Sequence, residues 1–336
     1  MKRLIVLLAV VLLIVFCAAP SSARFRDWNP QGKSPWVGKG RVAVRVIDMA
    51  REVASMKRER RRIENRLDQV RPSPEKVELG RLLFFDKVLS GNENISCASC
   101  HHSFASTGDG LTLPVGEGGN GFGMTRDTGE GFDAIERRVP RNSPHVFNLG
   151  LAELGYFPFI FWDGRIELAP DLENGFISPA GEDLPMGLDN VLAAQAVFPV
   201  TSAEEMAGQP GENPVANAAH AGNLAGEDGV WNLLVERLRQ IPEYVELFAA
   251  AFPDVNSASD LSIVHVANSI AAFEFEFGLA MNSPFDRFLL GDKSALSFKA
   301  KKGMALFYGK ANCAGCHYGV LQTDNAFHSV AMPQVG

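Results

Sequence analysis

CASCH, at Cys97–His101, is the stretch that decides how this chain is organised. Two thiols about one helical turn apart and a histidine directly after them form the attachment signature of a c-type haem. Each thiol can form a thioether to a vinyl group of the porphyrin, and the imidazole can reach the iron. The same signature recurs as CAGCH at Cys313–His317. The sequence therefore predicts two covalent haem c groups, with His101 and His317 as iron ligands.

A Cys-x-x-Cys pair can also be a zinc knuckle, a redox dithiol or a disulfide site. A histidine after both pairs would be a rare coincidence, and zinc would prefer its four ligands in one compact unit, whereas these pairs lie far apart in the chain. Of the five cysteines only Cys17 lies outside the two motifs, so none is left for a structural disulfide. Haem attachment is assigned to Cys97, Cys100, Cys313 and Cys316.

The N-terminus is typical of a secretory leader. The charged residues of Met1–Arg3 precede an apolar run at Leu4–Ala19, and Ser21–Ala23 offers small residues for cleavage. We expect residues 1–23 to be removed on export to the periplasm, which agrees with the attachment of c-type haem outside the cytoplasm in bacteria. An uncleaved leader would be the one contact with a membrane, although the run is short for a spanning helix. Cys17 is expected to be a bystander rather than a lipid-attachment site.

The composition is that of a globular protein long enough for two cores, with 336 residues, 46% of them hydrophobic and 21% charged. The net charge of -7 at pH 7 argues against nucleic acid as a partner and permits a basic redox partner. The oligomeric state is left open by the sequence, a homodimer included.

Helical patterns dominate, so the expected fold class is mostly α. After an irregular lead-in at 24–43, Val44–Val70 is predicted to be one helix with a basic middle, for which a solvated face is favoured over contact with lipid or a partner. Gly80–Lys87 and Gly303–Lys310 form a weak repeat before the two motifs, and their apolar sides are expected to pack on the porphyrins. Further helices are predicted at Trp231–Gln240, from Pro242, at Asp260–Phe277 and from Ser283, with long loops at 108–133 and 207–229.

With these features the chain resembles the bacterial di-haem cytochrome c peroxidase family, which includes MauG-like proteins. The resemblance runs from about Pro74 to the end. Its ordered blocks are Leu79–Asp86 with Leu89–Ser90, the first haem motif, Arg141–Pro144, Phe161–Arg165, Glu205–Met206, Ser283–Arg287 and the second haem motif. It implies two cytochrome c-like helical domains, each with one covalent haem c. The implied division is a leader at 1–23, an N-terminal extension at 24–71, a peroxidatic first-haem domain at 72–282 and an incomplete electron-transfer domain at 283–336.

The resemblance also implies roles for individual residues. Trp162 matches a tryptophan that relays electrons between the haems, and Asn142 matches a ligand of a calcium ion between the domains. Glu205 and Gln195 match the distal pair of the peroxidatic pocket, with Glu204 as the alternative base. A carboxylate there can take the proximal proton of hydrogen peroxide and return it to the departing oxygen, which promotes cleavage of the O–O bond.

Two departures from the family pattern change the expectation. Phe132–Pro140 contains no histidine of the kind that caps the peroxidatic iron in other members, so we expect an open, five-coordinate first haem that reacts without prior reduction. The chain ends at Gly336, before the part that supplies the second haem's distal Met or Tyr, so we expect a fragment or a shortened product. Met332 is expected to be a loop residue rather than that ligand. Structural roles are expected for His145, His220 and His265. His102 is expected to face solvent or a haem propionate, and His328 to make a packing or propionate contact rather than bind iron.

The leading functional prediction is a periplasmic di-haem peroxidase. It would reduce hydrogen peroxide to water at the first haem, with electrons from a small redox protein such as a cytochrome c or a cupredoxin entering through the second. An alternative is MauG-like oxidation of a protein or organic substrate through high-valent iron. A third is a non-catalytic di-haem electron carrier, against which the distal acid/base pair argues.

Overall fold

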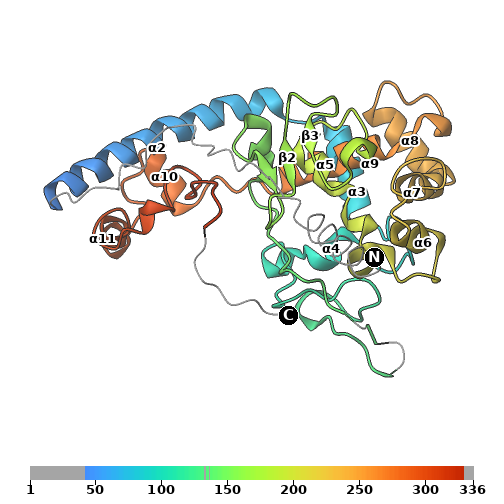
Figure 1. The fold of residues 1–336 in the computed structure, drawn as a ribbon. Coiled ribbons are helices and arrows are strands. Elements are labelled where there is room, and N and C mark those ends of the chain that lie inside the picture. The colour runs from blue at the N-terminus through green and yellow to red at the C-terminus, as the bar shows by residue number, and fades with distance from the viewer. Residues whose placement is uncertain (1–41, 132–133, 136, 329–336) are drawn as a thin grey trace, which may run out of the picture.

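A computed structural model describes residues 42–131, 134–135 and 137–328. The leader, most of the lead-in and Met332 lie outside these residues. Helices dominate the described part, which confirms the mostly α class; they form a larger group around α3 and α9 and a smaller group with α10 (Pro284–Leu290) and α11 (Phe298–Phe307) (Figure 1). Within the described ranges, no helix is long and apolar enough to cross a membrane.

Helix α2 (Val42–Val70) runs from α10 and α11 to the larger group of helices (Figure 1). It begins two residues before the predicted helix and ends where predicted. Most arginines of its basic middle form the expected solvated face, namely Arg58, Arg61 and Arg62. Arg60 is the exception, because it is buried against the start of α10.

The larger core is built on the close crossing of α3 (Pro74–Phe85) and α9 (Ile263–Phe277). Gly80 permits this approach, because a Cβ atom there would overlap the carbonyl oxygen of Ser269. The helices that complete this core are α5 (Val191–Ala196), α6 (Pro214–His220), α7 (Val230–Arg239) and α8 (Pro242–Ala251). Burial of their apolar faces against α3 and α9 is the main term that stabilises this part of the molecule.

Short elements connect the helices. The one sheet in the described residues is antiparallel with strand order β1-β2-β3, and in it Glu167 pairs with both Phe159 and Ile177. Its strands are β1 (Phe159–Ile160), β2 (Ile166–Leu168) and β3 (Phe176–Ile177). The short helical turns are α4 (Cys97–Cys100), η1 (Ser103–Ala105), η2 (Gly123–Thr125), η4 (Leu149–Leu154), η5 (Gly181–Asp183), η6 (Pro199–Thr201), η7 (Ala203–Ala207), η8 (Ala258–Asp260) and η9 (Cys313–Gly315).

A smaller core joins α2 to the C-terminal helices. Its buried members are Met56, Leu289, Tyr308 and Ala314. A third cluster, here called the junction cluster, lies between the two cores. In it Ile63 and Leu67 of α2 pack with Leu151, Leu154 and Phe275. Helix α2 therefore contributes to both the smaller core and the junction.

Three predicted boundaries need correction. The expected loop at 207–229 contains α6, which begins where Asn213 caps the helix and Pro214 occupies its first position. Helix α9 begins at Ile263 and not at Asp260, because Ser262 and His265 form a capping box. The helices before the haem motifs also begin earlier than predicted, at the serine caps Ser73 and Ser297.

Candidate haem sites and distal pocket

The first haem motif forms the one-turn helix α4. The Ser96 N–H donates to Ser99 Oγ at 3.1 Å, and the His101 N–H donates to the Cys97 carbonyl at 2.9 Å. The helical spacing places both thiols on one side of the turn. Burial raises the pKa of the Cys97 and Cys100 thiols to about 12, so without a bound group both thiols are protonated.

The His101 ring is oriented by its Nδ1 atom. Nδ1 lies 3.1 Å from the Thr107 carbonyl oxygen and 3.4 Å from Ser143 Oγ. In the tautomer that donates Nδ1–H to this carbonyl, Nε2 is unprotonated, which is the form that binds a metal. Burial lowers the pKa of His101, so the imidazole remains neutral, as a metal ligand must be. Ser143 also donates to the Cys100 carbonyl at 2.9 Å, which ties the Arg141–Pro144 block to the motif.

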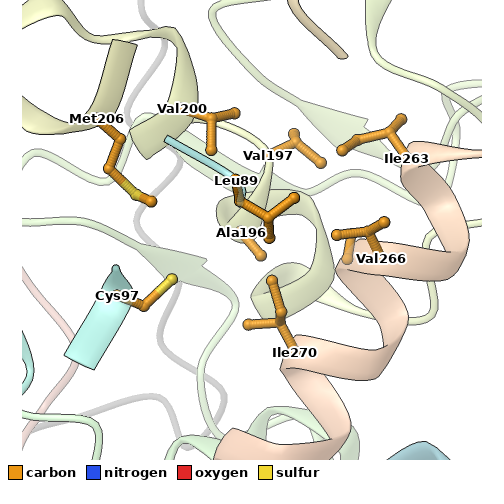
Figure 2. A pocket seen from close by; sticks show the side chains of 10 residues that line it. Leu89, Cys97, Ala196, Val197, Val200, Met206, Ile263, Val266 and Ile270 are labelled. Atoms are coloured by element: carbon orange, nitrogen blue, oxygen red, sulfur yellow. The ribbon is translucent and has the colours of Figure 1, made fainter. Parts of the chain in front are cut away.

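An apolar cavity lies beside Cys97 (Figure 2). Its walls come from α5, from the turns that carry Val200 and Met206, and from Val266 and Ile270 on one face of α9. In Figure 2 the Cys97 sulfur faces these aliphatic side chains. A thioether at Cys97 would therefore place a porphyrin edge against apolar side chains, so the two thiols, the imidazole and this apolar lining suit a covalent haem c.

The two predicted distal residues are next in sequence to residues that line this cavity, although neither is itself part of the lining. Gln195 on α5 and Glu205 on the π-helical turn η7 each directly precede a residue that lines it. The Glu205 N–H donates to Ser202 Oγ at 3.3 Å, which caps η7. Glu205 is also close enough to Cys100 for its charge to raise the pKa of that thiol. The fold thus brings the predicted acid/base group to the first haem motif.

The electrostatic surroundings of Glu205 suit proton transfer. Burial raises the pKa of Glu205 to about 7, while Arg165 opposes this rise and Glu204 adds to it. The Arg165 guanidinium is held 3.7 Å from the centre of the Phe161 ring. A carboxyl group with this pKa can accept and release a proton near neutral pH. The neighbouring Glu204 forms a backbone hydrogen bond, in which its carbonyl accepts the Glu117 N–H at 3.1 Å.

Two further predicted site residues, Trp162 and Asn142, meet directly. The Trp162 Nε1–H donates to the Asn142 backbone carbonyl at 2.8 Å, and Trp162 remains 58% exposed. The Asn142 side-chain amide lies 2.5 Å from the Leu111 carbonyl and 3.4 Å from that of Thr112. Asn142, Leu111, Thr112 and Asp109 line one polar pocket. Its amide, carbonyl and carboxylate oxygens are of the kind that calcium binds.

The second haem motif forms the turn η9, and both of its cysteines are exposed. His317 Nδ1 lies 3.2 Å from the Gln322 carbonyl oxygen, which repeats the arrangement of His101 with Thr107. The same tautomer therefore leaves Nε2 of His317 free for a metal. This site too has the two thiols and the imidazole that haem c requires.

Residues 74–294, more than half of the chain, match the family model described as di-haem cytochrome c peroxidase. This chain belongs to the di-haem cytochrome c peroxidase family. The predicted family is thereby confirmed. Haem c as cofactor and a peroxidase-type oxidoreductase activity are what membership of this family implies. The first haem motif lies within the matched region of this peroxidase family, and the second lies beyond it.

Relatives within the family include peroxidases and MauG proteins. The methylamine utilization protein MauG of Methylorubrum extorquens is 34% identical over 260 residues, which cover 77% of this chain and 54% of that protein. The cytochrome c551 peroxidase of Pseudomonas aeruginosa is 30% identical over 248 residues, 74% of this chain and 51% of that protein. A solved MauG-like protein associated with microbial copper homeostasis has 27% identity and a TM-score of 0.48, over 78% of this chain and 58% of that one. The chain thus spans about half the length of the curated relatives it matches.

Two of the remaining histidines, His265 and His328, form hydrogen bonds to neighbouring side chains. His265 bonds through Nδ1 to Ser262 and through Nε2 to Asp254 at 3.1 Å, as predicted for a structural histidine. His328 Nε2 lies 2.8 Å from Asp324. Cys316 lies within 4.8 Å of both, but a thioether would remove its sulfur from metal binding. This group therefore does not replace haem attachment at the second motif.

The sequence did not identify three residues that bear on these sites. Thr107 and Gln322 act through backbone carbonyls, which leave no signal in residue type. Glu274 is buried on α9, and its Oε2 has no hydrogen-bond partner among the described residues. Burial raises the pKa of Glu274 to about 8. An acidic residue inside an apolar helix, between two phenylalanines, is the signal that could have revealed it.

Proposed function

We propose that this chain forms the catalytic part of a periplasmic di-haem peroxidase that reduces hydrogen peroxide to water. Electrons would come from a small redox protein, a cytochrome c or a cupredoxin, and would enter at the second haem motif. The observation that carries this proposal is Glu205, a carboxyl group with a pKa of about 7 beside the cavity at Cys97. A non-catalytic electron carrier has no use for such a group.

Glu205 would move one proton during the reaction. As a carboxylate it takes the proton from the peroxide oxygen nearer the iron, and as an acid it returns this proton to the departing oxygen, which leaves as water. With two electrons and two further protons, one peroxide gives two waters. Haem iron, when bound, supplies the site for peroxide and carries the electrons. Gln195 would orient the peroxide, and Arg165 favours the ionised form of Glu205 that accepts the first proton.

Trp162 would lie on the path of electrons from the second haem to the first. Its hydrogen bond to Asn142 fixes the indole, and Asn142 would also bind calcium through its side-chain oxygen. The separate cores support a first-haem unit at 72–282 and a second-haem unit at 283–336, preceded by an extension at 24–71 that follows a leader. His101 and His317 would be the proximal ligands, and a homodimer is compatible with this arrangement.

MauG-like oxidation of a protein or an organic substrate is the second candidate. Two observations favour it: Phe132–Pro140 contains no histidine, and a MauG protein is 34% identical to this chain. In that case electrons would flow from the substrate, and Glu205 would keep its role in the reaction with peroxide.

The test is stopped-flow mixing of the fully oxidised holoprotein with hydrogen peroxide. A rapid change in the Soret band without prior reduction supports both enzymatic candidates, and an unchanged band overturns both. Steady-state assays then separate them, because a peroxidase consumes peroxide with reduced cytochrome c or cupredoxin as donor. Peroxide-dependent oxidation of an organic substrate, without turnover of these donors, would establish the MauG-like reaction instead.

A further inference from the structure

Helix α2 contacts the loop that follows the second haem motif. The Glu52 carboxylate accepts the Gly319 N–H at 3.0 Å. Met56 is buried, and its sulfur lies 3.5 Å from the Tyr308 hydroxyl. Helix α2 lies outside the region that matches the family model, at 74–294. Its contacts with this loop are therefore a feature of this chain rather than of the matched region.

Gln322 is the residue on which these contacts converge. Its backbone carbonyl lies 3.2 Å from His317 Nδ1. Its side-chain oxygen accepts the Tyr308 hydroxyl at 2.9 Å, and its Nε2 donates to the Gly319 carbonyl at 2.6 Å and to Met56 Sδ at 3.7 Å. Gln322 has φ of 56°, a left-handed conformation that non-glycine residues rarely adopt. The satisfied side chain thus holds a backbone turn that would otherwise be unfavourable.

The middle of α2 is fixed to the start of α10. Arg60 is buried, with Nε 3.2 Å from Asp286 Oδ1 and Nη2 donating to the Met281 carbonyl at 2.6 Å. Breaking a buried ion pair of this kind is costly, so α2 is held firmly at this point.

The C-terminal half of α2 is fixed to the larger group of helices. Glu59 accepts a hydrogen bond from Tyr156. Ile63 and Leu67 are buried in the junction cluster. Helix α2 therefore contacts the junction cluster, the start of α10 and the loop after His317. Because α2 is fixed at the first two places, it can hold this loop in position.

We propose that Glu52 and Met56 are positioning residues for the second haem. They hold Gly319 and Gln322 so that the Gln322 carbonyl accepts the His317 Nδ1 proton. This inference rests on the proposed function only in requiring that His317 binds a haem. The contacts of both residues are with the loop and with Tyr308, so each would act on the haem through the loop.

The consequence of this positioning is a lower reduction potential at the second haem. A hydrogen bond from Nδ1 to a carbonyl makes the imidazole a stronger electron donor to its metal. A stronger donor stabilises the oxidised iron more than the reduced iron. Loosening the loop lengthens this hydrogen bond and should raise the potential at which electrons enter.

The experiment measures the midpoint potentials of both haems in the holoprotein by spectroelectrochemical titration, with EPR spectra of the oxidised haems. Met56→Leu keeps the packing and removes the sulfur acceptor, and Glu52→Ala removes the carboxylate. In the double variant we expect the reduction equilibrium of the second haem to shift roughly tenfold towards the reduced form, about 59 mV for one electron. The potential of the first haem and its rate with peroxide should not change.

Two control variants sharpen the test. Arg58→Ala removes an exposed charge from the same helix and should leave both potentials unchanged. Glu52→Gln, as a single variant, keeps an oxygen that can accept the Gly319 N–H, so the second haem should keep its wild-type potential. The proposal is overturned if the double variant retains two haems and the potential of the second is unchanged, or if both haems shift equally. Failure of the wild-type protein to react with peroxide would refute the proposed function and leave this measurement intact.

Discussion

The ring of Phe84 lies 6.3 Å from the imidazole of His101, at an angle of 47°. The second motif repeats this relationship, with Phe307 at 6.3 Å and 45° from His317. The two phenylalanines hold corresponding places in the weak repeat of Gly80–Lys87 and Gly303–Lys310. The internal similarity therefore extends from sequence to the surroundings of both predicted iron ligands, which supports duplicate haem sites.

The two phenylalanines should differ in their contribution to stability. Phe84 is almost fully buried and packs 5.1 Å from Phe273 on α9, whereas Phe307 is only partly buried. Phe84→Ala should lower the free energy of unfolding by about 3–5 kcal/mol, and Phe307→Ala by clearly less. Urea denaturation of the holoproteins followed by far-UV circular dichroism measures both. Equal losses for the two variants would contradict the assigned difference in burial.

Replacement of Glu205 tests the acid/base role. Glu205→Gln keeps the size of the side chain but cannot accept the peroxide proton, so the reaction with peroxide should slow by roughly 100-fold or more. The second-order rate constant from stopped-flow absorbance is the measurement. Glu204→Gln is the matched control and should react nearly as fast as the wild type. If Glu204→Gln slows the reaction and Glu205→Gln does not, the base is Glu204.

The pH dependence of the same reaction should report the pKa of Glu205. Burial raises this pKa to about 7, so the carboxylate that accepts the peroxide proton is lost as the pH falls through 7. Below this pH the rate constant should fall by about tenfold per unit, and above it the rate constant should level off. The Glu205→Gln variant should show a flat profile over the same range. A midpoint near 7 that persists in this variant would assign the titration to another group.

Much of this arrangement could be predicted from residue type and spacing. The haem motifs, the Ser283 cap and the helices from Trp231 and Pro242 carry local signals, and the structure reproduces them. Helix α6 was not predicted, because the Gly- and Asn-rich flanks of its seven residues outweighed the Asn213 cap. The supports of the two histidines could not be predicted, since they act through the backbone carbonyls of Thr107 and Gln322, a group that every residue type carries.

Trp162 should govern transfer of electrons between the haems. Trp162→Phe removes the indole and its hydrogen bond to the Asn142 carbonyl, so we expect slower oxidation of the second haem after peroxide is added to the reduced protein. The reaction of peroxide with the oxidised protein should proceed at the wild-type rate. Rapid-mixing spectra resolve the two steps. Leu168→Ala, at a similarly exposed apolar residue of β2, is the control, and an equal effect in both variants would remove the relay assignment.

Glu274 should make the fold less stable as the pH rises. Burial raises its pKa from 4.5 to about 8, so between these values the folded chain holds a proton that the unfolded chain has released. Unfolding then releases a proton, and the free energy of unfolding falls with rising pH by up to about 1.4 kcal/mol per unit across this window. Glu274→Gln removes the titrating group, so its stability should depend less on pH and exceed that of the wild type most clearly near pH 8. Glu246→Gln, at an exposed position on α8, should leave the pH dependence unchanged. Denaturation at pH 5, 6.5 and 8 measures these differences, and parallel curves for the wild type and Glu274→Gln would show that Glu274 titrates as an ordinary carboxyl group.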